Sequence, residues 1–366
     1  MTAPRLRATI SFDLDDLWTY LKTRGNRSWV SYPTYLPVIV PRALALLDEL
    51  KVPITFFVVG RDAARPQNSE LLRALASGGH EIGNHSYEHD CWLHRYQPQQ
   101  LENDIRRAEE AIESATGRRP QGFRGPGFSW SVRLLEVLAA RGYRYDASTL
   151  PTIVGPFARL YFLRAAQLTP EQRREREALF GSFSDAMRPL VPYRWKLASG
   201  RRILEVPVTT MPVTRLPFHL SYLVYLSSYS WYAMAAYLET SLALCRAWRV
   251  EPSFLLHPLD LLGPSEAPGL QFFPGMTVSI QRKAEVFRHA IRRIRRHFRV
   301  VTLESLTDDL AKDITLSIRD PEGSFDSNSR ASLVTGGAET APASLPFGLR
   351  PPESLTHADP EVYRET

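Results

Sequence analysis

Short runs that favour strands alternate with longer amphipathic segments along most of the chain. Most of the short runs are apolar and rich in β-branched or aromatic residues, and they lie at Ala8–Phe12, Ile54–Val59, Glu81–Gly83, Gly122–Arg124, Ile203–Val208, Ser253–Leu256 and Val300–Leu303. The segments between them repeat apolar residues every three or four positions, which predicts helices at Pro41–Leu50, Glu70–Ala76, Gln99–Ala115, Ser131–Ala140 and Trp231–Trp248. This alternation predicts an α/β fold with a parallel sheet or a barrel.

Two regions depart from the alternation. Residues 155–202 combine a charged run with many aromatic residues and prolines, so we expect an insertion there rather than another strand–helix unit. From residue 318 the composition changes to Ser, Gly, Pro, Ala and acidic residues, which predicts a disordered tail at 318–366. The folded domain is therefore expected at residues 1–312.

The segment Leu216–Leu238 contains no charged side chain and can be interpreted in three ways. Its 23 residues are long enough to span a membrane. It also contains Pro217, His219, several serines and five tyrosines, and Tyr and Trp prefer the membrane–water interface. The segment is therefore interpreted as a buried wall or cap of a site, as an interfacial membrane contact, or as a true span.

The charge of the chain is unevenly distributed. A hydrophobic content of 44% and a charged content of 23% are typical of a globular protein, and the net charge is +6. Much of the positive charge gathers in one expected helix, Arg282–Arg299, which contains Arg282, Lys283, Arg288, Arg292, Arg293, Arg295, Arg296 and Arg299. A basic face suits nucleic acid, anionic lipid or a phosphorylated substrate, and a solvated helix face explains it equally well. Nucleic acid is not expected, because no aromatic stacking platform is interleaved with these residues.

The N-terminus and the cysteines bear on the compartment. Only Cys91 and Cys245 are present, so no disulfide framework is expected. Met1–Arg7 is polar and basic and has no apolar region before the first strand, which predicts that no signal peptide is present. We therefore expect a cytoplasmic protein, peripheral on the inner face of any membrane that it meets.

Carboxylates and imidazoles at two strand ends indicate a metal site. Asp13 and Asp15 are two positions apart at the end of the first expected strand, so they share a face, whereas Asp16 points elsewhere or starts a loop. His85 and His89 are four positions apart, which would bring them together on a helical turn. Two His and one Asp around an open-sided metal commonly activate water for hydrolysis. The alternative is that Asp15-Asp16 only caps a turn.

Three later segments place further polar groups at strand ends. Arg124-Gly-Pro-Gly-Phe128 supplies a cation and a closely approachable backbone, although an ordinary Gly-Pro turn would look the same. His257 follows a late apolar strand and suits protonation of a leaving amine, although a structural histidine is the alternative. Tyr145-Asp146 ends another short strand-like segment.

This ordered set of motifs resembles the polysaccharide deacetylases, the family 4 carbohydrate esterases with the nodulation protein B homology domain. The resemblance covers roughly residues 7–150 and 203–305. It implies a distorted (β/α)7-type barrel and a divalent metal, most often Zn²⁺, that is held by one Asp and two His.

Carried over position by position, the resemblance also implies a role for each residue. Asp13 would be the catalytic base and Arg124 would hold it, and His257 would be the general acid with Asp146 as a candidate to tune it. The metal ligands would be Asp15, His85 and His89. Substrate contacts, including an oxyanion-stabilising N–H near Gly127, are expected from Gly125, Pro126, Gly127, Phe128 and Trp18.

The first motif departs from the commoner family pattern, in which two adjacent Asp precede a Gly. Here Leu14 separates Asp13 from Asp15, and no Gly follows. The spaced form resembles the branch of intracellular and small-amide deacylases, and it leaves open whether Asp15 or Asp16 is the metal ligand.

The expected function is metal-dependent hydrolysis of an amide on an amino sugar, by N-deacetylation or N-deformylation. The aromatic segment and the basic helix together could seat the protein on an anionic membrane surface, so a lipid-linked or membrane-presented glycan is the expected substrate. The alternatives are a soluble amidase of a small nitrogen compound, similar to allantoinase-type relatives, and a non-catalytic carbohydrate- or nucleic-acid-binding protein. The oligomeric state is not predicted.

Overall fold

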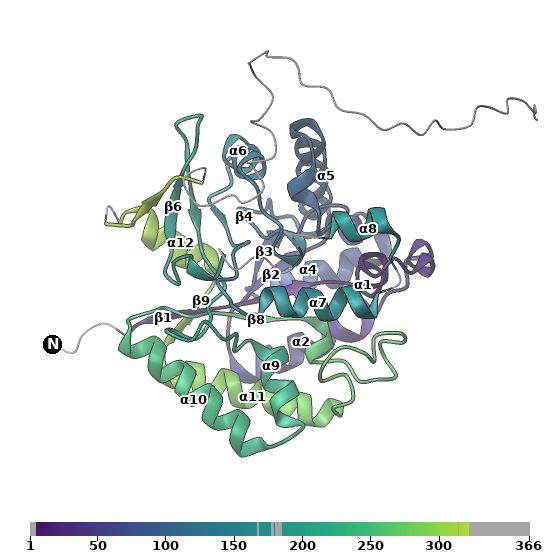
Figure 1. Cartoon of the computed structure of the whole chain (residues 1–366), viewed down its shortest axis with the longest axis vertical. Coiled ribbons are helices and arrows are strands. Elements are labelled where there is room, and N and C mark those ends of the chain that lie inside the picture. The colour runs from purple at the N-terminus through teal and green to yellow at the C-terminus, as the bar shows by residue number, and fades with distance from the viewer. Residues whose placement is uncertain (1–4, 167, 177–178, 180–184, 314, 322–366) are drawn as a thin grey trace, which may run out of the picture. The chain divides into compact units, whose positions relative to one another are not determined.

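The parallel strands of the predicted fold pair side by side in one sheet (Figure 1). The computed structural model describes residues 5–166, 168–176, 179, 185–313 and 315–321. Adjacent strands pair in the order β7-β5-β4-β3-β2-β1-β8, all in parallel, and β9 also pairs with β1. Their bounds are β1 (Arg7–Leu14), β2 (Thr55–Val58), β3 (Glu81–Asn84), β4 (Gly122–Phe123), β5 (Tyr145–Asp146), β7 (Arg202–Glu205), β8 (Ser253–Leu256) and β9 (Arg299–Val301).

The chain that follows β7 closes this sheet into a barrel. The Val208 N–H donates to the Thr149 carbonyl beyond β5 at 2.9 Å, and the Thr209 N–H donates to the Ser253 carbonyl of β8 at 3.0 Å. The Ser253 N–H returns a 2.8 Å bond to the Thr209 hydroxyl. The last junction therefore consists of a few bonds rather than a regular ladder, and this is the distortion of the barrel. The predicted (β/α)7-type barrel is confirmed.

Helices follow most of the strands, as the alternation predicts. Their bounds are α1 (Leu17–Thr23), α2 (Leu36–Leu50), α3 (Gly60–Ala63), α4 (Ser69–Ser77), α5 (Pro98–Thr116), α6 (Val132–Ala140), α9 (Leu220–Ser227), α10 (Trp231–Ala247), α11 (Ile280–His297) and α12 (Leu303–Ala311). Short 3-10 turns lie at Arg27–Ser31, Pro66–Asn68, Leu93–Arg95, Pro126–Phe128, Asp185–Met187 and Pro258–Asp260. Helix α2 begins before the expected start at Pro41, because Pro37 occupies its first turn and Pro41 lies inside it.

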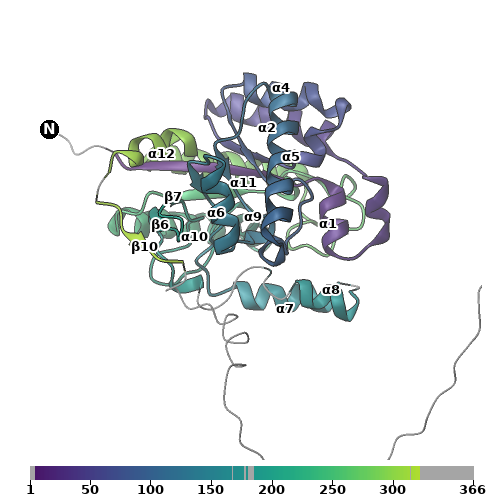
Figure 2. The same cartoon turned by 90° about the horizontal axis from the view of Figure 1, so that it is seen from above.

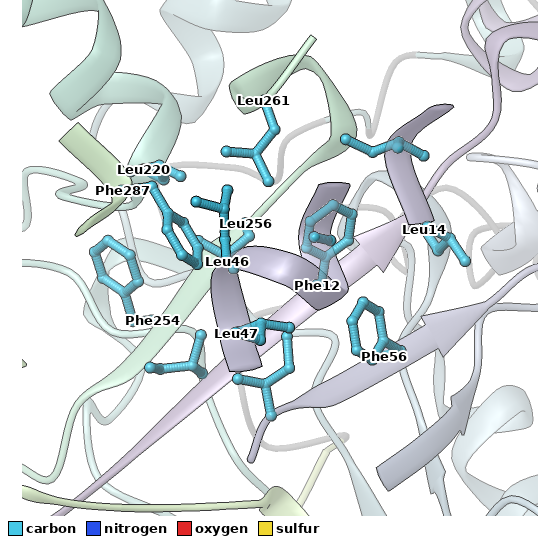
Figure 3. Packing of buried hydrophobic residues seen from close by; sticks show 14 of the residues in the cluster. Phe12, Leu14, Leu46, Leu47, Phe56, Leu220, Phe254, Leu256, Leu261 and Phe287 are labelled. Carbon is cyan, nitrogen blue, oxygen red and sulfur yellow. The ribbon is translucent and has the colours of Figure 1, made fainter. Parts of the chain in front are cut away.

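The largest core cluster lies between the strands β1, β2 and β8 and the helices α2, α9 and α11 (Figure 3). Phe12 and Phe56 from neighbouring strands are fully buried, with ring centroids 5.4 Å apart. Full burial of a side chain of this size contributes roughly 1.5–3 kcal/mol. Because Phe12 alternates with Asp13 along β1, the residues that anchor this strand in the core also direct its polar neighbours to the opposite face.

The segment expected as an insertion, 155–202, contains α7 (Gly155–Ala165), α8 (Pro170–Glu175) and β6 (Tyr193–Lys196). Strand β6 pairs antiparallel with β7, so this end of the segment is part of the sheet. A short strand, β10 (Ile318–Arg319), pairs with β6 and extends two residues into the range expected as a tail. The rest of that range, 322–366, lies outside the described residues.

The uncharged segment Leu216–Leu238 folds into α9 and the first half of α10. Leu220, Leu223 and Val224 are buried against the core, whereas Tyr229 and Tyr232 are exposed. In the part of the chain that the structure describes, no helix combines the length and apolar character needed to span a membrane. The segment thus folds as two helices joined by a turn, and one face of α9 packs against the core.

The basic helix α11 is only partly a charged face. Lys283 is fully buried, and its ammonium donates to the Leu259 and Leu262 carbonyls at 2.6 Å, so it does not belong to the exposed charge as expected. Arg288 and Arg292 both pair with Glu49. Neighbouring acidic residues therefore offset part of the charge of this helix.

Candidate active site

Three side chains meet where β1 and β3 end. The Asp15 Oδ1 atom lies 3.1 Å from His85 Nε2 and 2.9 Å from His89 Nε2. All three residues are buried, and one ligand atom from each lies within 4.8 Å of the others. One carboxylate and two imidazoles are a donor set typical of zinc sites that keep a position open.

Asp16 is used by the backbone instead. Its carboxylate accepts the Leu17 N–H at 2.8 Å, which caps α1, and the Tyr35 N–H at 2.9 Å. Burial raises the pKa of Asp16 to about 6 in spite of these bonds. The open choice between Asp15 and Asp16 therefore favours Asp15, whose oxygen faces both histidines.

The two histidines come together on a loop, so the expected helical turn is wrong. Ser86 and His89 both adopt left-handed backbone conformations, with φ of 63° and 53°. Asp104 of α5 fixes the loop by accepting the Tyr87 and Glu88 N–H groups at 2.9 and 3.1 Å. Burial raises the pKa of Asp104 to about 6. The histidine rings lie 5.0 Å apart as a result.

The hydrogen bonds of His85 test whether this group of residues suits a cation. Its Nδ1 atom lies 2.7 Å from the Arg124 carbonyl, which can only accept, so Nδ1 carries the proton. In the neutral ring, Nε2 then presents a lone pair to an Asp15 oxygen, and two acceptors repel each other. A bound cation removes this conflict, and a backbone carbonyl on the other ring nitrogen is typical of metal-ligating histidines. The residues therefore fit a divalent metal.

Without a metal, protonation would have to relieve the same conflict. Burial disfavours the charged imidazolium of His85. The hydrogen bond to Asp15 and the negative charge of Asp15 outweigh the effect of burial, so the pKa of His85 is raised. Burial would likewise raise the pKa of Asp15, but the charge of His89 and the bonds from both imidazoles lower it. Both pKa shifts have the same cause, which is that positive charge between these residues stabilises them.

Asp13 lies beside this group and is held by Arg124. The Arg124 Nη1 atom donates to Asp13 Oδ1 at 2.7 Å and to the Ser11 hydroxyl at 2.8 Å, and its Nε donates to the Ala147 carbonyl at 2.9 Å. The guanidinium is fully buried and lies over the Phe57 ring. Asp13 therefore keeps one fixed oxygen towards Arg124, and its Oδ2 atom is left for a second partner.

His257 lies on the other side of Asp13. It follows Leu256, which pairs with Phe12, so the parallel register places His257 beside Asp13 at the same barrel end. The ring atom Nδ1 of His257 is 3.4 Å from the Ser221 hydroxyl of α9. The backbone N–H of His257 donates to the Asp260 carboxylate at 2.8 Å. The ammonium of the buried Lys283 donates to the Leu259 and Leu262 carbonyls, which flank Asp260, and so stabilises the turn that follows His257.

Two residues expected at the site lie elsewhere. Among the described residues, Asp146 bonds to the Ser148 hydroxyl at 2.5 Å and has no contact with His257. Burial raises the pKa of Asp146, and the nearby Glu205 raises it further. Trp18 is fully buried, and its indole N–H donates to Asp62 at 2.8 Å, so it offers no surface to a substrate. Asp260, rather than Asp146, is the acidic neighbour of His257.

The loop from Gly125 to Phe128 lies beside the site and is tightly constrained. A Cβ atom at Gly125 would lie 1.9 Å from the Ser129 carbonyl oxygen, so no larger residue fits there. Gly127 and Phe128 adopt φ of 59° and 62°, and the Phe128 N–H already donates to the Gly125 carbonyl. If this loop stabilises an oxyanion near Gly127, as expected, the Phe128 N–H is not the free donor.

Tyr20 is a candidate that sequence patterns do not reveal. It lies on α1, and the carboxylates of Asp15, Asp260 and Asp13 are close enough to influence its hydroxyl. Burial, together with these negative charges, raises the pKa of Tyr20 well above its usual value, so the phenol stays protonated. Its position four residues after Asp16 carries no motif, and only the turn into α1 brings it back to the metal ligands.

Comparison with known proteins agrees with this geometry. Residues 21–145 match the polysaccharide deacetylase family. The peptidoglycan deacetylase of Helicobacter pylori is 29% identical over 118 residues, which cover 32% of this chain and 39% of that protein. The chitooligosaccharide deacetylase of a Bradyrhizobium species is 34% identical over 107 residues, which cover 29% of this chain and 48% of that protein. The matches thus span half or less of these relatives.

One solved structure resembles the described fold over most of its length. The crystal structure of a candidate polysaccharide deacetylase from Mycobacterium smegmatis is 21% identical, with a TM-score of 0.53 over 85% of this chain and 92% of that one. At this identity the likeness shows the fold alone. The resemblance to the polysaccharide deacetylase family is confirmed, and the roles of the individual site residues stay predictions.

Proposed function

Because residues 21–145 match the polysaccharide deacetylase family, we propose that this protein is a metal-dependent N-deacylase of an amino sugar, a hydrolase of C–N bonds other than peptide bonds. One observation carries the proposal: the triad Asp15, His85 and His89 lies directly beside an Asp13 that is held by a buried arginine. A triad of ligands alone would fit a structural metal. A second, oriented carboxylate beside an open ligand set is what hydrolysis of an amide requires.

The metal would be held by Asp15 Oδ1 and the two imidazole Nε2 atoms, and Zn²⁺ suits this donor set best. When bound, such an ion polarises an amide carbonyl and lowers the pKa of water, which supplies a nucleophile near neutral pH. His85 is prepared for this role because its Nδ1–H is fixed on the Arg124 carbonyl. Arg124 therefore orients a proposed ligand through its backbone and the proposed base through its side chain.

The proton transfers follow from the positions of Asp13 and His257. Arg124 binds Asp13 Oδ1, so Oδ2 is the atom that takes the proton of the attacking water. The Nδ1 atom of His257 faces Ser221, so its Nε2 donates a proton to the amine as the C–N bond breaks. The carbonyl carbon gains the water oxygen, and the products are a carboxylic acid and a free amino sugar.

Substitution of the proposed base tests this assignment. We expect Asp13→Asn to lower kcat on N-acetylated chitooligosaccharides by about 10²–10⁴-fold, because a positioned general base contributes that much. Elemental analysis should show that the variant retains its metal, since Asp13 is not among the ligands. Asp48→Asn, an exposed change on α2, is the matched control. Near-normal activity in a metal-loaded Asp13→Asn variant would show that Asp13 is not the base.

We propose further that the amino sugar is presented on a lipid at an anionic membrane surface. Two features support this. Tyr229, in the turn between α9 and α10, and Tyr232, in the first turn of α10, are exposed by 72% and 84%. A cavity of about 660 Å³ on α11 is lined mainly by basic and aromatic residues, with one acidic residue among them: Trp231, Arg282, Glu285, Arg288, His289, Arg292, Arg293 and Arg296. Aromatic side chains with adjacent arginines suit an anionic headgroup region.

Mass spectrometry of cell extracts tests the substrate class and names the acyl group. Cells that carry Asp13→Asn should accumulate a glycolipid that is heavier by one acyl group than the species in wild-type cells. Accumulation confined to water-soluble metabolites would contradict the membrane-presented substrate and favour a small amide. The expected location at the inner face of the membrane stays a prediction.

A further inference from the structure

Helix α7 carries its large apolar residues on the face that meets solvent. Phe157, Leu160 and Tyr161 are exposed by 63%, 48% and 53%, and Arg164 continues the same face one turn later. These four positions follow the i, i+3, i+4, i+7 spacing of one helix face. The opposite side, with Phe162, is buried against the protein. A surface helix normally shows polar residues to water, so this arrangement indicates a surface made for an apolar partner.

The buried side of α7 is attached beside the candidate active site. Phe162 packs in one cluster with Cys91, Trp92 and Leu179. Cys91 comes two residues after the proposed ligand His89. Leu179 reaches the substrate loop, since a Cβ atom at Gly127 would lie 2.7 Å from it. This side of α7 therefore rests on both loops that carry the site.

The other flank of α7 reaches the site through a second chain of contacts. The Tyr161 hydroxyl donates to the Phe272 carbonyl at 3.0 Å, and the Phe273 ring packs edge-on against Tyr20 at 5.4 Å. The hydroxyl of Tyr20 in turn lies close enough to Asp15 for that carboxylate to raise its pKa. Figure 2 shows α7 and α8 along one edge of the described structure, with α2 and α4 on the opposite side. Helix α7 thus lies at the border of the site, and its apolar face points away from the protein.

Further exposed apolar side chains continue this surface. Ile153, just before α7, donates its N–H to the Arg215 carbonyl, and the Arg215 guanidinium binds the Arg188 carbonyl. These bonds join the short segments that carry Ile153, Val213 and Met187, which are 41%, 68% and 83% exposed. We call Ile153, Phe157, Leu160, Tyr161, Met187 and Val213 the α7 surface. Large apolar side chains that gather on exposed segments in this way are typical of interaction sites.

We propose that the α7 surface docks on the bilayer and brings a lipid-linked amino sugar to the metal site. This inference rests on the proposed function. Aliphatic residues such as Leu160 and Val213 offer no hydrogen bonds to a glycan, whereas they fit among acyl chains. Arg159 and Arg164 on the same helix suit anionic headgroups, and Tyr161 suits the interface. Contact through this helix would hold the lipid where its sugar can reach Asp13 and Asp15.

The test compares two exposed positions on different helices. Leu160→Asp places a charge in the α7 surface, and Val38→Asp places one on α2, on the opposite side of the described structure. Flotation with phosphatidylcholine vesicles, with and without phosphatidylglycerol, should show at least about tenfold weaker binding for Leu160→Asp. Val38→Asp should bind nearly as wild type does. Unchanged circular dichroism and melting temperature would show that both variants are folded.

Activity separates this inference from the proposed function. Leu160→Asp should hydrolyse a water-soluble N-acetylated oligosaccharide at the wild-type rate and lose at least about tenfold on a lipid-linked substrate in vesicles. Absence of activity on either substrate in the wild type, with vesicle binding still dependent on Leu160, would contradict the proposed function and leave the docking surface in place.

Other occupants of the surface would give different results. Wild-type vesicle binding for Leu160→Asp, or loss of binding only for Val38→Asp, would overturn the proposal. A raised KM of Leu160→Asp for the soluble oligosaccharide would show that the surface binds glycan instead. Concentration-dependent dimerisation that Leu160→Asp abolishes, without vesicle binding by the wild type, would show that it binds a second copy.

Discussion

Two buried carboxyl groups at opposite ends of the barrel have opposite surroundings. Glu81 at the start of β3 accepts bonds from the Thr55 hydroxyl, the Tyr145 hydroxyl and the Glu304 N–H at 2.6, 2.5 and 2.8 Å. Asp15 after β1 faces two imidazole nitrogens. Burial raises the pKa of Glu81 because its partners are neutral, whereas the imidazoles outweigh burial and lower the pKa of Asp15. Two carboxyl groups that are both buried thus have pKa shifts in opposite directions, and the groups that they contact decide the direction.

The comparison separates a structural end of the barrel from a reactive one. The donors around Glu81 are supplied by the protein itself, so nothing further is needed there. At the other end the acceptor atoms converge, and a bound cation would complete the site. This division agrees with the general rule that parallel barrels place function at the carboxyl ends of their strands.

The largest effect is expected when the carboxylate of the reactive end loses its charge. Asp15→Asn should release the metal and lower kcat more than about 10³-fold, because the bound ion supplies several kcal/mol of stabilisation to the transition state. Glu81→Gln, the matched change at the other end, should keep both metal and activity. Elemental analysis and rate measurements on a soluble N-acetylated substrate check both variants. An Asp15→Asn variant with full metal content would refute the ligand assignment.

A smaller effect is expected at Tyr20, whose hydroxyl lies close to Asp15 and is not among the proposed ligands. Tyr20→Phe removes this hydroxyl and should weaken metal binding by about 10–100-fold, as loss of a group that orients a ligand typically does. Competition with a chelator measures the affinity, and Tyr232→Phe on the exposed end of α10 is the control. If Tyr20 only fills space against Phe273, Tyr20→Phe should bind metal as wild type does.

The sequence predicts the barrel strands well because their burial appears directly in the composition. Residues around Phe12, Phe56 and Phe254 form apolar runs, and such runs have few alternatives in an α/β chain. Asp13, Asp15 and His257 were placed correctly at strand ends for the same reason. The part of the sheet that was not predicted, β6 with β10, depends on pairing between segments far apart in the chain.

The errors in the predicted site concern what a buried polar side chain faces. Lys283 looks like one more charge on a basic helix, and only the fold shows that two carbonyls bind its ammonium. Asp146 and Trp18 lie near the right strand and helix, but Ser148 and Asp62 occupy their polar atoms. The His85–His89 pair was recognised from a helical spacing, although two left-handed residues bring the rings together. Partners of this kind are set by tertiary packing, which spacing does not encode.

The smallest expected effect concerns stability at the structural end. The pKa of Glu81 is raised in the folded protein above its ordinary value of 4.5, so the folded state holds this proton more tightly than the unfolded chain. Its contribution to stability is therefore complete below about pH 4.5 and is lost as the pH rises through the raised pKa.

Glu81→Gln removes this titration but keeps the side chain's shape. The wild type should exceed the variant in free energy of unfolding by about 1–3 kcal/mol in acid, the usual cost of disturbing a buried hydrogen-bonded group. The difference should shrink towards neutral pH, where burial of the ionised carboxylate costs the wild type stability. Urea denaturation of the metal-free proteins across this range measures it. A difference that grows with pH would mean that the folded protein stabilises the carboxylate, so that the two ends of the barrel differ less than the geometry indicates.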